Sequence, residues 1–373
     1  MSMLNEAKRG SLVDDRDRSL KGRIKEIIPW KGDDIKEIIR KLVFIGAVAF
    51  LIYWCYTAYI YNFGSKSMID DQKYLAGLLD KAESDASDDK NDAQKPATPV
   101  VNDKNEQSGG DNTDTVVKEP AVMMKKFDEL YKLNPDIVGW ISIDGIYLGD
   151  SDDELAINYP VVQTSDNDYY LEHDFFGEIK DYGALFVDYR AKVGGDEGRS
   201  SNVTIYGHNM KTEYYFHHLR DYNTIDPTFI SKHRLVNFSS LYSDDQYIIF
   251  ACFYVSVNEE DDNLPLFSYH NCVEFNDLSQ FDYWYKNVMY RNYYRTDIEC
   301  DINDEYLTLS TCAFEIGDSR FVVVARKLRE GEDPDDYTYE YNSKRHMPKK
   351  WYNVFDYSMP IDDGPDYEYY IPE

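Results

Sequence analysis

The sequence predicts a mainly β domain, either a barrel or a sandwich, in which helices interrupt the strands. Turn residues separate eight short runs of alternating or β-branched residues, at 138–143, 159–163, 184–189, 202–206, 234–237, 245–257, 306–311 and 321–328. The connection between 257 and 306 is too long to lack structure of its own. With 15% aromatic residues, the chain can also fill a sizeable core.

The first element is an apolar segment, Leu42–Tyr61, which has 20 residues and no charge. As a helix it would cover about 30 Å, the thickness of the bilayer hydrocarbon. Arg40 and Lys41 precede it directly, so the positive-inside rule predicts a cytoplasmic N-terminus and an external C-terminus. We interpret 1–41 as a cytoplasmic tail and 42–61 as a single-pass anchor in the cell membrane. A cleaved signal peptide and a buried core helix are the alternatives.

Residues 62–119 are predicted to be a flexible, acidic, extracellular tether. A helical pattern continues over 65–82, but from 83 to 119 the composition is polar and offers few large apolar side chains. Such a segment cannot offset its chain entropy by burial.

The folded domain is expected over 120–330. It opens with an amphipathic helix at 124–133, which Asn134-Pro135 ends, and carries helical inserts at 214–220 and 277–290. The remaining residues, 331–373, are acidic and rich in Tyr. This extension either docks on the domain or remains an acidic tail. One hypothesis is that it folds back near a cleft and limits access, so that its deletion would raise turnover.

Composition excludes some classes of function and site. A net charge of −29 argues against a nucleic-acid partner. Five cysteines do not form a disulfide-rich framework, although Cys272 and Cys300 could pair outside the cell. The acidic run 259–262 lacks the spacing of a calcium loop and is expected to be a solvated loop. No metal or other cofactor is predicted.

A thiol and a guanidinium occupy the ends of two consecutive strands. Alternation puts Cys312 on the more polar face of the strand 306–311, and a loop follows it. Arg320 opens the next strand, so a hairpin would bring it near Cys312 and leave Arg326 at the far rim. Cys252, inside an apolar run, is expected to pack in the core. Of the seven histidines, His208 is the strongest candidate partner, because it follows a strand and a glycine.

Five blocks occur in order along the chain: Asn134-Pro135-Asp136-Ile137-Val138-Gly139-Trp140-Ile141, Asn158-Tyr159-Pro160-Val161-Val162-Gln163, Gly183-Ala184-Leu185-Phe186-Val187-Asp188-Tyr189-Arg190, Tyr206-Gly207-His208-Asn209-Met210 and Leu309-Ser310-Thr311-Cys312 with Arg320. Together they resemble the class B sortases, the cysteine transpeptidases of Gram-positive cell walls. The similarity covers roughly residues 122–330 and excludes the Tyr-rich extension.

The resemblance implies an eight-stranded sortase-type β-barrel with N-terminal helices and a helical insert before the Cys strand. It also implies the catalytic roles: Cys312 as nucleophile, His208 as acid and then base, and Arg320 as stabiliser of the oxyanion. The groove for the sorting signal would be lined by Asn167, Leu171, Thr311 and Glu315.

The function that follows is cleavage of a C-terminal sorting signal after Thr, and transfer of the substrate protein to an amine of the cell wall. The expected partners are surface or pilin proteins that bear the signal, and a peptidoglycan precursor or a pilin amine as acceptor. A pilus-assembling sortase that joins pilins through Lys is one alternative. A thiol hydrolase that releases the acyl group to water is another, and a non-catalytic binding module is a third.

Overall fold

The computed structural model describes residues 24, 27–92, 120–149 and 154–359, and the chain divides into two units after Asp70. The first unit contains the N-terminal part of one helix, α2 (Ile35–Asp92). Its segment Ile35–Ala58 has 24 residues, is almost wholly exposed, and is long and apolar enough to cross a membrane. This segment overlaps the predicted anchor 42–61. Most of the predicted cytoplasmic tail, up to residue 23, lies outside the described residues.

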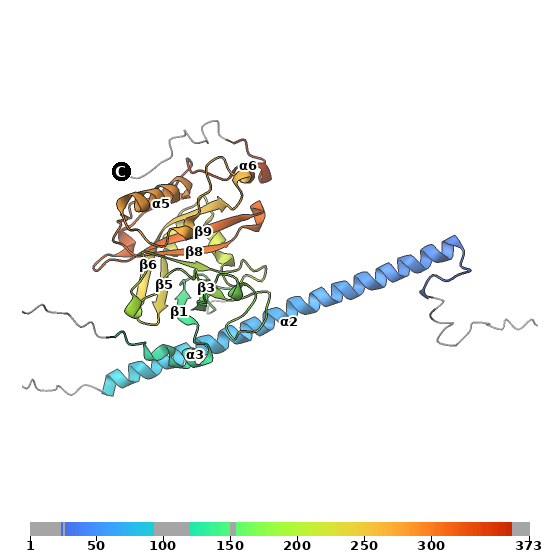
Figure 1. The fold of residues 1–373 in the computed structure, drawn as a ribbon, viewed down its shortest axis with the longest axis horizontal. Helices are drawn as coiled ribbons and strands as arrows, with labels where there is room; N and C mark the ends of the chain where they lie inside the picture. The colour runs from blue at the N-terminus through green and yellow to red at the C-terminus, as the bar shows by residue number, and fades with distance from the viewer. Residues whose placement is uncertain (1–23, 25–26, 93–119, 150–153, 360–373) are drawn as a thin grey trace, which may run out of the picture. The chain divides into compact units, whose positions relative to one another are not determined.

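The second unit is built on a closed barrel of eight strands, so the barrel and not the sandwich is the correct alternative. Every predicted strand is present within a few residues of its predicted bounds. Around the barrel the order is β1-β2-β3-β4-β8-β9-β6-β5, and β1 pairs with β5 to close it. Figure 1 labels β1, β3, β5, β6, β8 and β9 of this barrel. The strands are β1 (Ile137–Ser142), β2 (Asn158–Val162), β3 (Leu185–Val187), β4 (Asn202–Tyr206), β5 (Leu235–Ser240), β6 (Asp244–Ser256), β8 (Tyr306–Cys312) and β9 (Ser319–Lys327).

Helices occupy the predicted places. The insert before the Cys strand is α5 (Leu278–Arg291), whose first turn is capped because the Asp277 carboxylate accepts a hydrogen bond from the Gln280 N–H at 3.0 Å. The other α-helices of this unit are α3 (Asp128–Leu133), α4 (Thr228–Lys232) and α6 (Lys349–Val354). Short stretches of 3-10 helix are η1 (Lys125–Phe127), η2 (Tyr169–Leu171), η3 (Gly195–Glu197), η4 (His217–Tyr222), η5 (Glu259–Asp261), η6 (Tyr269–Asn271), η7 (Phe314–Ile316) and η8 (Pro334–Asp336).

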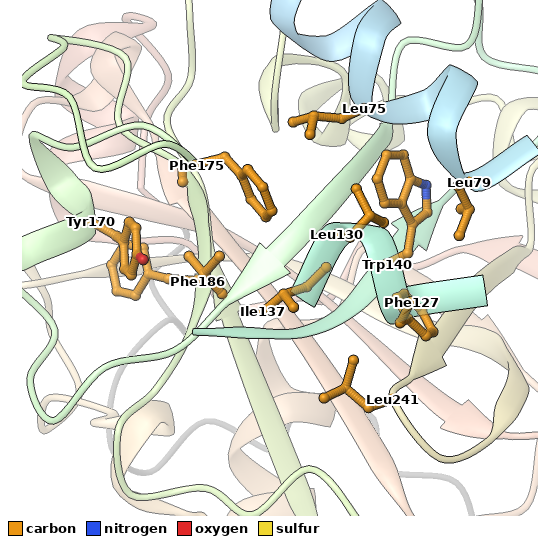
Figure 2. Packing of buried hydrophobic residues seen from close by; sticks show 12 residues of the cluster. Leu75, Leu79, Phe127, Leu130, Ile137, Trp140, Tyr170, Phe175, Phe186 and Leu241 are labelled. Carbon is orange, nitrogen blue, oxygen red and sulfur yellow. The ribbon is translucent and has the colours of Figure 1, made fainter. Parts of the chain in front are cut away.

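The C-terminal part of α2 belongs to the core of the second unit. Leu75 and Leu79 are buried in one hydrophobic cluster with Trp140 of β1 and Leu130 of α3 (Figure 2). The helical pattern noted over 65–82 lies within α2, and residues 83–92, predicted to be flexible, are helical as well. Leu75 and Leu79 show that α2 covers apolar side chains of the barrel. The rest of the predicted tether, 93–119, lies outside the described residues.

The extension after the last barrel strand docks on the domain. Its strand β10 (Tyr339–Tyr341) pairs with a short strand that was not predicted, β7 (Tyr294–Thr296). The Tyr339 ring is buried, and its hydroxyl donates a hydrogen bond to the carbonyl oxygen of Ile249 at 2.7 Å. Of the two alternatives for the extension, docking is correct up to residue 359; residues 360–373 lie outside the described part.

Candidate active site

The antiparallel hairpin of β8 and β9 brings the thiol and the guanidinium together. In its register, Cys312 is the direct partner of Arg320, and Tyr306 is the partner of Arg326. Facing residues of antiparallel strands have Cβ atoms about 5 Å apart. The predicted separation of the two arginines is confirmed. Arg326 is buried at the other end, where it forms an ion pair with Glu332 at 3.0 Å.

The candidate histidine approaches from the neighbouring strand. Strand β4 runs parallel to β8 with Tyr206 opposite Ser310, and both strands end at the same rim. The Thr311 hydroxyl then donates to the carbonyl oxygen of Gly207 at 2.8 Å, which ties the two chain ends together. His208 follows directly.

Gly207 is needed here because of close packing. A Cβ atom at this position would lie 2.3 Å from Leu185 Cδ2 and 2.7 Å from Phe216 Cδ2. A larger residue would push the chain away from the barrel wall. The glycine therefore holds the backbone close to the barrel just before His208.

Two hydrogen bonds fix the chain around His208. Its Nε2 lies 2.9 Å from the carbonyl oxygen of Leu171. A carbonyl only accepts, so Nε2 carries a proton in this arrangement. The next residue, Asn209, is buried and donates from Nδ2 to the carbonyl oxygen of Cys312 at 2.9 Å. Asn209 thus joins the histidine loop to the backbone of the thiol residue.

A cavity of about 360 Å³ opens at this rim. Cys312, His208 and Arg320 all line it, and apolar and aromatic rings form much of its wall. In an acidic chain, none of the described residues that line this cavity carries a carboxylate. The lining consists of Asn167, Leu171, Phe186, Tyr206, Gly207, His208, Ser256, Val257, Leu266, Phe267, Ser268, Tyr269, His270, Ser310, Thr311, Cys312 and Arg320.

Three of the four predicted groove residues line the cavity, namely Asn167, Leu171 and Thr311. Glu315 does not. Its Oε1 accepts hydrogen bonds from Arg220 Nε at 2.9 Å and from the Tyr254 hydroxyl at 2.6 Å. These contacts hold η7 against the barrel, so Glu315 has a structural place beside the thiol strand.

A buried carboxylate organises one side of the cavity. Asp188 is fully buried and accepts hydrogen bonds from Arg190, from the Tyr206 hydroxyl at 2.9 Å and from Asn167 Nδ2 at 3.0 Å. Arg190 binds it with two nitrogens, at 2.8 and 2.7 Å. Burial alone would raise the pKa of Asp188, but these donors, Arg190 first among them, hold that pKa below its usual value.

Arg190 also contacts His270, which lies in the part of the cavity lining that follows β6. Its Nη2 also donates to the carbonyl oxygen of His270, at 2.8 Å. Next to His270, the Tyr269 hydroxyl lies 2.6 Å from the Ser310 hydroxyl on the thiol strand. Burial raises the pKa of Tyr269 to about 12 and lowers the pKa of His270. Both side chains are therefore uncharged at neutral pH.

Sequence reasoning missed Asp188, Asn209 and Tyr269. Asp188 and Asn209 lie inside two of the motif blocks, next to residues already singled out, and that position is a usable signal. Tyr269 lies in the long connection after β6, where no periodicity marks a contact with the thiol strand.

The remaining cysteines do not join the site. Cys252 is buried in β6, as predicted, and burial raises its pKa well above its usual value. Cys272 and Cys300 are free cysteines, so the possible disulfide between them is not formed in this structure.

The comparisons with known proteins agree with this arrangement. The model of the Sortase domain family matches residues 153–328. Sortase B of Listeria monocytogenes is 33% identical over 187 residues, which make up 50% of this chain and 67% of that protein. Sortase B of Staphylococcus aureus is 27% identical over 206 residues, which make up 55% and 75% of the two proteins. The solved Staphylococcus aureus sortase B–substrate complex is 26% identical, with a TM-score of 0.46 over 56% of this chain and 87% of that chain.

A closed barrel with a thiol, an imidazole and a guanidinium at one rim is an arrangement suited to cysteine acyl transfer. The chain belongs to the sortase family and is a class B sortase. The resemblance seen in its motifs is confirmed, and the family is one of cysteine transpeptidases.

Proposed function

We propose that this class B sortase is a membrane-anchored transpeptidase that cleaves a C-terminal sorting signal after Thr and transfers the substrate protein to an amine of the cell wall. The observation that carries the proposal is the direct cross-strand pairing of Cys312 with Arg320 in a cavity that His208 also lines. The three side chains supply a nucleophile, an oxyanion donor and a proton carrier.

In the first half of the reaction, the Cys312 thiolate attacks the carbonyl carbon of the Thr residue in the signal. The C=O electron pair moves to oxygen, and the Arg320 guanidinium, held at the start of β9, stabilises the negative charge. The tetrahedral intermediate then collapses, the C–N bond breaks, and His208 gives a proton to the leaving amine. The product is a thioester on Cys312 and a free C-terminal peptide.

In the second half, an amine attacks the thioester carbonyl carbon. His208 takes a proton from the attacking nitrogen, the C–S bond breaks, and the thiolate of Cys312 leaves as a new amide forms. Asn209 acts through the backbone: its bond to the Cys312 carbonyl keeps the thiol in place through both steps.

The apolar helix segment Ile35–Ala58 supports a single-pass anchor. With Arg40 and Lys41 in the cytoplasm, the barrel would lie on the outer face, where wall amines are found. The cavity lacks carboxylates among its described lining residues, which suits a peptide carbonyl that becomes an oxyanion.

The test uses the full chain in nanodiscs and quenched fluorescent peptides of the Asn-Pro-x-Thr-x and Leu-Pro-x-Thr-Gly types. Each peptide is run alone, with a glycine or diaminopimelate-type amine, and with a lysine side-chain amine. Mass spectrometry identifies the products. We expect cleavage after Thr and an amide product with a wall-type amine.

Cys312→Ala should abolish cleavage, whereas the matched variant Cys272→Ser, which removes a thiol outside the cavity, should retain it. A product formed only with the lysine amine would replace the proposal by the pilus-assembling alternative. Release to water alone, whatever amine is present, would replace it by the hydrolase.

A further inference from the structure

The segment after the barrel is attached to the domain through buried polar contacts. The family model ends at residue 328, so the extension lies beyond the part of the chain that the family defines. Asn342, which follows β10, is 1% exposed; its N–H donates to the carbonyl oxygen of Tyr293 at 2.8 Å and its Nδ2 to that of Asn292 at 3.0 Å. These contacts fix the direction in which the chain continues.

The chain then meets the loop that forms one wall of the cavity. His346 is fully buried, and its Nε2 lies 2.5 Å from Oδ1 of Asp262, whose side chain is 1% exposed. The same oxygen accepts the N–H groups of Asn263 at 2.7 Å and Leu264 at 3.1 Å. The acidic run 259–262, expected to be a solvated loop, therefore holds a buried carboxylate that needs His346 as its partner.

This contact lies close to the cavity in sequence. Val257 and the run Leu266–His270 line the cavity on either side of Asp262. Without His346 the buried Asp262 carboxylate would keep, among the described residues, only the two backbone N–H donors of Asn263 and Leu264. A buried carboxylate that loses its imidazole partner is unfavourable, so we expect the loop to open and hydrate Asp262. The wall of the cavity thus depends on a residue of the extension.

A second contact reaches the turn between the thiol and the guanidinium. Lys350 of α6 forms an ion pair with Asp261 at 3.1 Å and holds the pKa of that carboxyl below its usual value. Its side chain also lies directly on Gly317, where an added Cβ would be 2.7 Å from Lys350 Nζ. Gly317 has φ +72° and turns the chain between Cys312 and Arg320.

The two loops are also joined to each other. The Val257 N–H donates to the carbonyl oxygen of Asp318 at 3.0 Å. Lys350 therefore lies where the cavity wall and the turn of the β8–β9 hairpin meet.

From these contacts we infer that the extension 331–359 is a brace for the active site, in which His346 and Lys350 are positioning residues. His346 holds the wall that receives the peptide, and Lys350 holds the turn that sets Cys312 against Arg320. The inference rests on the proposed function, because peptide turnover is one of its readouts. The hypothesis that the extension limits access predicts faster turnover when the extension is lost, whereas a brace predicts slower turnover.

The two residues should affect different constants. We expect His346→Ala to raise the KM of the peptide about tenfold with a smaller fall in kcat, because the wall binds substrate. His346→Gln, whose Nε2 can still donate to Asp262, should restore most of the binding. Lys350→Met keeps the stem but removes the ion pair, and should lower kcat about tenfold, because small misplacements of reacting groups slow the chemical step.

The matched control is Lys349→Met, which removes the exposed neighbouring lysine on α6. All variants are studied as the full chain in nanodiscs. Constants that match those of Lys349→Met in folded Lys350→Met and His346→Ala proteins would overturn the inference. Faster turnover would also overturn it, in favour of the extension as a lid.

Hydrogen–deuterium exchange supplies a readout that does not need activity. His346→Ala should speed exchange in 257–268, and Lys350→Met in 313–318, relative to Lys349→Met. If the wild-type chain cleaves no peptide, the proposed function fails, but this exchange pattern still decides whether the brace exists. Unchanged exchange in both segments would rule it out.

Discussion

Cys312 and Arg320 face each other as the last residue pair of the ladder between β8 and β9. The turn between them is short and is held by η7 and by the glycine at 317. The β ladder therefore places the backbones of the two residues opposite each other, and the turn that joins them holds the end of the ladder in place. Rigid elements of this kind position reacting groups better than loops do.

The first prediction concerns Arg320. Arg320→Ala should lower kcat by about 10² to 10³, the loss typical of removing an oxyanion donor. Arg320→Lys should recover only part of this, because an ammonium lacks the fixed fork of a guanidinium. Steady-state kinetics with a cleaved peptide measure both Arg320 variants. The control is Arg329→Lys, at an exposed position that does not line the cavity. A loss seen only in KM would mean that Arg320 binds the substrate and does not stabilise the oxyanion.

Asn209 is predicted to act through the backbone. Asn209→Ala removes its bond to the Cys312 carbonyl and should lower kcat about tenfold with little change in KM. Alkylation of Cys312 by iodoacetamide, followed by mass spectrometry, should show an altered rate at this thiol alone. Equal kcat values for variant and wild type would contradict the positioning role.

Glu315 is predicted to stabilise the fold beside the site. Arg220 and Tyr254 both donate hydrogen bonds to the charged Glu315 carboxylate. Glu315→Gln removes that charge and weakens both bonds, so it should lower the melting temperature. The KM of the peptide should stay within about twofold of wild type. Thermal unfolding and kinetics of the same preparation test this. A large rise in KM with unchanged melting would return Glu315 to the groove.

Asp188 predicts a pH dependence of stability. Its pKa is lowered in the folded state, so its contribution is complete above the unfolded value of about 3.9 and disappears as pH falls through the lower folded value. Asp188→Asn should cost about 2 kcal/mol at pH 7, because the charge-assisted hydrogen bonds from the partly exposed Arg190 to the buried carboxylate are weakened.

Denaturant unfolding of wild type and Asp188→Asn from pH 7 down to pH 3 measures this difference. The difference in unfolding free energy should stay constant as the pH falls to the usual pKa of an Asp side chain, and it should shrink only in stronger acid. A gap that already closes between pH 7 and pH 5 would show that another group governs it.

Prediction from the sequence succeeded where the signal is local. The alternation of 306–312 was enough to place Cys312 at a strand end, and eight residues of separation were enough to choose Arg320 over Arg326. A strand register is set by neighbours that sequence patterns describe well. Six of the seven predicted site residues line one cavity. Register accounts for Cys312 and Arg320, whereas the groove residues Asn167, Leu171 and Thr311 came from the resemblance to the family.

Prediction failed where the partner is distant in the chain. Asp262 looks like a solvated acid because the residue that buries it, His346, comes 84 positions later. The contact of Glu315 with Arg220 spans 95 positions. The helical pattern over 65–82 was visible in the sequence, but its packing was not: Leu75 and Leu79 pack on a tryptophan far along the chain, and the helix continues through 83–92, where composition suggested a flexible segment. Tertiary burial overrides local composition in each case.

The packing of Leu75 and Leu79 has a practical meaning for where this enzyme can be cut. The edge of its folded domain falls within a continuous helix, upstream of the residues that the sequence suggests as a natural start. A protein that begins at residue 120 would leave Trp140 and Leu130 uncovered by α2, and the exposed apolar surface would favour aggregation. Cleavage by a protease after residue 92 would release an intact enzyme only if the helix fragment remained bound.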